Sequence, residues 1–173
     1  VLLKTEAYLY EVNMGATAIG TGITATPGYA EKCVAQLAKI TGKPIVGPKD
    51  LIAATSSMQA FVMFSSAYKN LAVTLSKISS DLIFLASGPR NGIFEINLPA
   101  LQPGSSIMPG KVNPVMPEVM NQVCYKVMGN DVTVTIASQN GLLQLNAYEP
   151  VVAIAIMESQ AIFYKTMPLF RKN

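Results

Sequence analysis

The chain has 173 residues, of which 50% are hydrophobic and only 13% are charged, with a formal net charge of +3. This length suits one domain with a sizeable core, and the 13 scattered Lys and Arg residues argue against a nucleic-acid-binding protein. Because no apolar run approaches the roughly 20 residues of a membrane span, we expect protein rather than lipid to cover the surplus apolar surface.

Histidine is absent, and the two cysteines, Cys33 and Cys124, lie far apart in the sequence. This composition offers neither the closely spaced ligands of a metal site nor a disulfide framework. We therefore predict buried free thiols in a reducing cytoplasm, with no bound metal or cofactor.

The first segment, to about Val12, already has the character of the middle of a helix. No capping residue or signal-peptide pattern precedes it, and the chain stops at Asn173 without a clear terminator. We interpret the sequence as an interior piece of a larger protein, truncated at both ends. Residues 13–22 are rich in small side chains and predict a close-packed turn. A phosphate loop is disfavoured there because no Gly-Lys-Ser/Thr follows.

A short amphipathic helix is predicted from Tyr29 to Thr41, because Cys33, Leu37 and Ile40 recur at i, i+4 and i+7. Gly42 and Pro44 supply its stop signal. After a short linker, Asp50 has the right side chain to cap the helix that follows.

The segment that follows indicates most clearly how the protein is built. Apolar residues recur at spacings of three and four over more than three heptads, at Phe61, Phe64, Tyr68, Leu71, Leu75, Ile78, Leu82 and Leu85. Ser87-Gly88-Pro89 ends this run. A helix of about 35 residues would be about 50 Å long, which implies a bundle of extended helices.

Residues 90–113 are predicted to be irregular but ordered, because prolines and glycines interrupt an apolar segment. A helix is expected from Pro114 or Pro117 to about Ala137, apolar nearly all round and hence buried, with the β-branched run 132–136 kept helical. Residues 139–148 form a polar break. Glu149 then opens a last helix with apolar positions at Val151, Ile154, Met157 and Ala161.

These elements predict an all-α fold, a bundle of long helices. Residues 1–173 are expected to form part of the central helical-bundle domain of a larger chain, with no internal domain boundary.

The loop between the two long helices has a distinctive sequence, Gly104-Ser105-Ser106-Ile107-Met108-Pro109-Gly110-Lys111-Val112-Asn113-Pro114. Its glycines and serines leave backbone N–H groups free to converge on an oxyanion, and Lys111 adds a positive charge. Pro114 suits the first position of the next helix, whose positive end then faces the same place. We interpret the loop as a carboxylate-binding element.

This loop resembles the signature Gly-Ser-Ser-x-Met-Pro-x-Lys-x-Asn-Pro of the aspartase/fumarase superfamily at every specified position. Members of that superfamily eliminate fumarate from a substituted succinate, and their central domain is a bundle of long helices. Residues 11–22, 117–131 and 144–150 resemble aspartate ammonia-lyases more than fumarate hydratases. The resemblance implies reversible elimination of ammonia from L-aspartate through an enediolate intermediate.

The same resemblance assigns roles within the loop. Ser105 would be the general base, and Lys111 with Asn113 would hold the second carboxylate of a small dicarboxylate substrate. Asn113 would also suit a helix cap. The full set of implied substrate-binding residues is Ser106, Ile107, Met108, Lys111 and Asn113, with Gly104 and Glu118 in supporting roles. For Glu118 a purely structural role at the helix N-terminus is an equal alternative.

By resemblance, the active sites are assembled from three segments contributed by three subunits of a homotetramer, and two of those segments would lie upstream of Val1. A piece of this kind is expected to be inactive alone. Two alternatives stay open: fumarate hydratase activity on L-malate and fumarate, and a catalytically inert structural or oligomerisation protein of the same fold.

Overall fold

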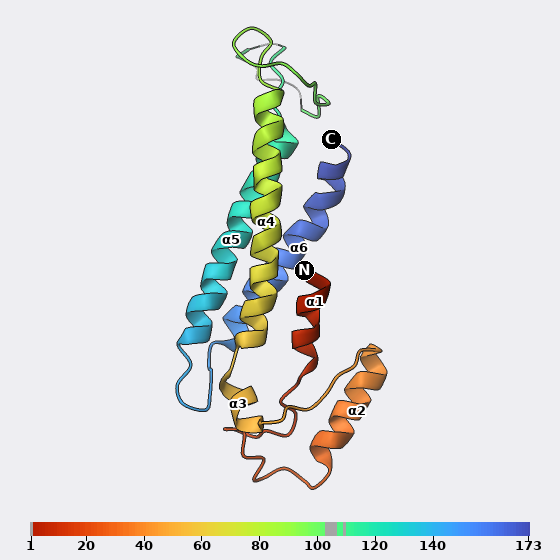
Figure 1. The fold of residues 1–173 in the computed structure, drawn as a ribbon, viewed down its shortest axis with the longest axis vertical. Coiled ribbons are helices and arrows are strands. Elements are labelled where there is room, and N and C mark those ends of the chain that lie inside the picture. Colours follow the sequence, from red (N-terminus) through yellow and green to blue (C-terminus); the bar gives the residue numbers. More distant parts are fainter. Residues whose placement is uncertain (1, 103–106, 109) are drawn as a thin grey trace. The chain divides into compact units, whose positions relative to one another are not determined.

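The computed structural model describes residues 2–102, 107–108 and 110–173 (Figure 1). Its elements are, in chain order, α1 (Leu2–Glu6), the 3₁₀ helix η1 (Ala7–Tyr10), α2 (Tyr29–Thr41), α3 (Leu51–Ser56), α4 (Gln59–Leu85), α5 (Val115–Gln139) and α6 (Glu149–Arg171). Over the described residues the only β pairings are two isolated bridges, so the predicted all-α fold class is confirmed.

The residues form two compact units. The first contains residues 1–67 and 131–156, and the second contains residues 68–130 and 157–173. The long helices α4, α5 and α6 therefore each contribute one part to each unit.

In the first unit, the N-terminal segment is tied to the linker after α2. Val46 donates its N–H to the Tyr10 carbonyl at 2.8 Å and accepts from the Val12 N–H at 3.0 Å. An ion pair between Lys43 Nζ and Glu6 Oε1, at 2.7 Å, supports the same connection. The nearby lysine lowers the pKa of the Glu6 carboxyl, chiefly through this hydrogen bond.

The predicted close-packed turn at residues 13–22 is confirmed, and Gly20 shows why small residues are required there. Its φ of +83° lies in the left-handed region, and a Cβ atom added to it would lie 2.3 Å from Ile52 Cα. Both facts exclude a side chain at this position. The turn therefore packs directly on the backbone of α3.

The predicted helix of about 35 residues was wrong, because the chain breaks between α3 and α4. Asp50 caps α3 as expected, with its Oδ1 accepting from the Ile52 and Ala53 N–H groups, each at 3.0 Å. Ser57 then leaves the helix with φ −84° and ψ 123°. Its Oγ accepts from the Gln59 N–H at 3.3 Å, which starts α4 afresh. At 27 residues, α4 is about 40 Å long.

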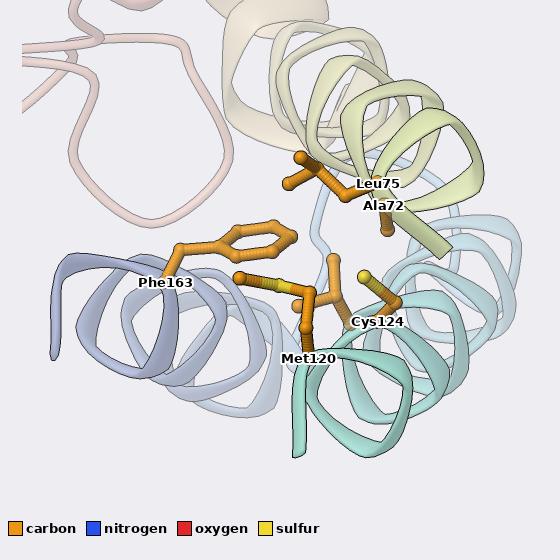
Figure 2. Packing of buried hydrophobic residues seen from close by; sticks show 6 residues of the cluster. Ala72, Leu75, Met120, Cys124 and Phe163 are labelled. Atoms are coloured by element: carbon orange, nitrogen blue, oxygen red, sulfur yellow. The ribbon is translucent and has the colours of Figure 1, made fainter. Parts of the chain in front are cut away.

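The core of the second unit is an apolar cluster shared by α4, α5 and α6 (Figure 2). Its buried members are Ala72, Leu75, Met120, Cys124, Val127 and Phe163. Tyr68 stacks on Phe163 at its edge, with ring centroids 6.3 Å apart. Burial raises the pKa of the Cys124 thiol to about 11, so this thiol stays neutral. The prediction of two buried thiols holds for Cys124, whereas Cys33 is only partly buried.

Helix α5 is helical throughout its β-branched run, as predicted, but it is not buried all round within this chain. Val119, Val132 and Ile136 are 40%, 56% and 51% exposed, because α4 and α6 cover only one side of the helix. The apolar stripe predicted for α6 also faces outward, with Ile154 61% exposed. The buried side of α6 instead carries Val152, Ala155, Ile156, Ser159 and Phe163. Spacing alone does not reveal which of two apolar faces packs within the chain.

The geometry at Gly20 predicts a large penalty for a side chain. Gly20→Ala should lower the free energy of unfolding by about 2–4 kcal/mol, because it combines left-handed strain with a backbone clash. Thermal unfolding followed by circular dichroism measures this change. Gly47→Ala is the matched control, since a Cβ there would meet nothing within 4 Å. Equal stability of the two variants would contradict the packing described here.

At Ser79 on α4, we expect a substitution to stabilise the protein. It is fully buried, and its Oγ has no hydrogen-bond partner among the described residues. Ser79→Ala removes this unsatisfied group and should raise the free energy of unfolding by about 1 kcal/mol. The control is Ser65→Ala, which removes a buried hydroxyl that donates to Asp131 Oδ1 at 2.9 Å and should destabilise the protein. Denaturant unfolding that ranks the variants in the reverse order would refute this.

Candidate active site

The described part of the signature loop leads directly into α5. The Lys111 N–H donates to the Met108 carbonyl at 3.2 Å, forming a turn. The first helical hydrogen bond runs from the Glu118 N–H to the Pro114 carbonyl, also at 3.2 Å. Pro114 therefore lies just before the first helical residue, Val115, rather than at the first helical position as predicted. Its missing N–H still removes no helical hydrogen bond at this position. The positive end of α5 faces the loop.

A cavity of about 410 Å³ lies beside this turn. One wall follows α4 and the other precedes α5. The lining residues are Ala86, Gly88, Pro89, Phe94, Ile96, Asn97, Leu98, Pro99, Gly110, Lys111, Val112, Asn113 and Pro114. Lys111 is the only charged residue among these described positions. A single cation in an otherwise neutral cavity, next to a helix N-terminus, suits a carboxylate.

The wall after α4 is held in place by Ser87. Its backbone carbonyl accepts from the Phe94 N–H at 2.7 Å, and its Oγ accepts from the Ile93 N–H at 3.2 Å. The Glu95 N–H donates to the Leu85 carbonyl at 2.9 Å. These bonds fold the segment back onto the end of α4. The expectation of an irregular but ordered segment is met for this part of the chain.

The structure brings together two of the predicted site residues. Lys111, which is exposed, and Asn113, which is partly buried, line the same cavity. Ile107 and Met108 are 87% and 50% exposed and are not among its lining residues. Gly104, Ser105 and Ser106 lie outside the described residues.

Glu118 is exposed on the first turn of α5. It does not belong to the described lining of the cavity. Its position near the helix N-terminus is electrostatically favourable in itself.

Asn97 is a lining residue that the sequence analysis missed. Its carboxamide is a polar group in the middle of an apolar stretch, between Ile96 and Leu98. This contrast between a polar residue and its apolar neighbours is the sequence signal that could have identified Asn97. With Asn113 it gives the cavity two amides in addition to the lysine.

A larger cavity of about 950 Å³ lies in the first unit. None of the predicted site residues that the structure describes lines it. Its charged lining residues are Glu11, Asp50 and Glu149 against a single lysine, Lys49. An excess of carboxylates would repel a dicarboxylate, so the smaller cavity is the better candidate for such a ligand.

In the second unit, Glu158 on α6 is engaged in structural contacts with α5. Glu158 Oε2 lies 3.0 Å from Lys126 Nζ and accepts from Asn130 Nδ2, also at 3.0 Å. These hydrogen bonds, with that from Lys126 the stronger, lower the pKa of the Glu158 carboxyl. In the part of the chain that the structure describes, no cluster of three metal-ligating side chains occurs. No helix there is both long and apolar enough to cross a bilayer.

The chain is similar in sequence to known lyases. The profile of a lyase family matches residues 2–129. Aspartate ammonia-lyase of Pseudomonas fluorescens is 56% identical over 173 residues, covering 99% of this chain and 36% of the relative. Aspartate ammonia-lyase of Escherichia coli K12 is 58% identical over 156 residues, covering 90% and 33%.

Solved structures agree with these sequence relatives. The fumarate lyase:delta crystallin from Brucella melitensis bound to cobalt superimposes with a TM-score of 0.91 at 51% identity, over 96% of this chain and 36% of that one. A class II fumarase from Schistosoma mansoni gives a TM-score of 0.89 at 31% identity, over 93% and 37%. The chain thus spans about a third of the length of these relatives. With its signature loop, its helical fold and these matches, the chain belongs to the aspartase/fumarase family of lyases.

Proposed function

We propose that the native protein that carries this chain is an aspartate ammonia-lyase, which reversibly eliminates ammonia from L-aspartate to give fumarate. The observation that carries this proposal is the 56–58% identity to aspartate ammonia-lyases over 90–99% of the chain. Identity to the class II fumarase is only 31%, which favours ammonia over water as the leaving group.

The chemistry requires a proton to leave the carbon next to a carboxylate. The C–H bond is weakly acidic, and the carbanion survives only if that carboxylate takes up the charge as an enediolate. The electron pair then forms the double bond of fumarate while the C–N bond breaks and ammonia departs. Donors aimed at the developing charge supply much of the rate, and the loss of one typically costs about a hundredfold or more.

Ser105 is proposed as the general base, which takes the proton as an alkoxide. This role rests on the signature loop, because Ser105 lies outside the described residues. Ser106, Ile107 and Met108 are proposed to bind the carboxylate that becomes the enediolate, with Gly104 in a supporting role. A serine alkoxide requires a positive surrounding potential, to which Lys111 and the N-terminus of α5 would contribute.

Lys111 and Asn113 are proposed to hold the substrate's other carboxylate. Their shared position in the 410 Å³ cavity supports this role, since an ammonium and an amide both donate hydrogen bonds to carboxylates. Glu118, one turn further along, is proposed as a supporting residue. The proposal invokes no cofactor.

The native protein is proposed to act as a homotetramer with shared active sites. Exposed apolar side chains on α5 and α6 support a protein partner for these faces, among them Val132, Ile136, Ile154 and Met157. The chain covers about a third of its relatives' length, and the remaining site segments are proposed to come from other subunits. This chain would contribute the base and one carboxylate-binding element.

The central prediction concerns Ser105. In the native protein, Ser105→Ala should reduce fumarate formation from L-aspartate by several powers of ten, because an essential base is removed. Fumarate is measured by its ultraviolet absorbance, with L-aspartate and then L-malate as sole substrate. Ser138→Ala is the control, since the Ser138 Oγ bonds only within its own helix, to the Val134 carbonyl at 2.6 Å.

Fumarate from malate alone would replace the proposal with a fumarate hydratase. Wild-type protein that converts neither substrate would favour a structural protein of the same fold. Retention of activity in Ser105→Ala would refute the assigned base even if aspartate is the substrate.

A further inference from the structure

One polar residue joins α4 and α5 near the candidate active site. Asn121 lies in the second turn of α5 and is 9% exposed. Its Oδ1 accepts a hydrogen bond from Ser76 Oγ at 2.9 Å, and its Nδ2 donates to Ser80 Oγ at 3.4 Å. Both serines belong to α4. A single amide therefore bridges two successive turns of the neighbouring helix.

Near the cavity this arrangement holds α5 in one position along α4, and the buried hydrogen bond from Ser65 to Asp131 joins the same two helices farther from the cavity. Ser76 and Ser80 are one helical turn apart, which corresponds to about 6 Å along the axis. A shift of α5 in either direction brings Asn121 nearer to one serine and breaks its bond to the other. The surrounding apolar contacts of Met120 and Cys124 are non-directional and define the register less sharply. Single buried amides set helix register in this way in coiled coils.

The two helices that Asn121 joins also carry the two walls of the 410 Å³ cavity. Helix α4 ends at Leu85, directly before the first wall at Ala86. The second wall contains Lys111 and Asn113 and ends at Pro114, directly before α5. Asn121 is about 9 Å from the start of α5 along the helix axis. A shift of α5 therefore moves Lys111 and Asn113 relative to the opposite wall by a similar distance.

We propose that Asn121 is a positioning residue, which sets the register of α5 on α4 and thereby the placement of Lys111 and Asn113 across the cavity. It contacts neither the substrate nor the reacting atoms and acts through the helix that it anchors. The proposal rests on the proposed function for the identity of the ligand. The anchoring itself depends only on the hydrogen bonds of the helices.

Asn121→Leu tests the proposal because it removes both hydrogen bonds while keeping the number and branching of the side-chain heavy atoms. Ser76 and Ser80 are not fully buried, so water can replace the lost partner. Lys111 and Asn113 are proposed to hold the non-reacting carboxylate, and displacing them should weaken substrate and transition state alike. The KM for L-aspartate should therefore rise about tenfold, and kcat should fall as well because Lys111 also contributes to the positive potential around Ser105.

Asn130→Leu is the matched control on the same helix. Asn130 is 6% exposed, and its Nδ2 donates to Glu158 Oε2 and Ser159 Oγ on α6, each at 3.0 Å. The same substitution there removes buried hydrogen bonds but leaves the cavity walls anchored. It should lower the melting temperature without changing KM by more than about twofold. If Asn121→Leu does not fold, Ser76→Ala removes the 2.9 Å bond with a smaller perturbation and should also raise KM.

A rise in KM confined to the Asn121 and Ser76 variants supports the proposal. An unchanged KM in folded variants, or an equal rise in Asn130→Leu, overturns it. If the wild-type protein acts on neither L-aspartate nor L-malate, the proposed function fails and amide hydrogen exchange decides the question of anchoring. Faster exchange over residues 110–118 in Asn121→Leu than in Asn130→Leu would support the proposal, and equal exchange would overturn it.

Discussion

The structure of the candidate site depends on the packing of α4 against α5. Ala72 and Leu75 on α4 contact a core that α5 supplies with Met120 and Cys124 (Figure 2). Because the two helices are connected by the signature segment, their packing brings the end of one next to the start of the other. The cavity with Lys111 is formed where the two ends meet. Burial of apolar side chains provides the affinity between the helices, and the amide of Asn121 is proposed to set their register.

Few charged side chains line the candidate site. The cavity has one lysine, two amides and the end of a helix, with no carboxylate among its described lining residues. A carboxylate that entered would gain from each of these groups without competing with an internal anion. The larger cavity of the first unit, with Glu11, Asp50 and Glu149, offers the opposite environment. This contrast supports the assignment of the dicarboxylate to the smaller cavity.

Local sequence signals predicted most of the fold. Tyr29 to Thr41 and the Asp50 cap depend on neighbouring residues, and both were correct. The break before α4 was missed because Ser57 leaves α3 through its extended backbone and starts α4 through its hydroxyl, within a continuous apolar pattern. The buried side of α6 was missed because that helix is apolar on two sides, and only tertiary contacts select between them. The loop was predicted as a site from its motif and Asn97 had only a weak sequence signal, whereas the contacts of Asn121 required the three-dimensional neighbourhood.

The proposed function depends on the claim that this loop and the start of α5 bind a substrate carboxylate. A crystal structure of the native protein with bound fumarate tests that claim most directly. One carboxylate should lie within hydrogen-bond distance of Lys111 Nζ and the Asn113 amide, with the other near Ser105. Fumarate bound elsewhere, with Lys111 and Asn113 in contact only with solvent, would contradict the account.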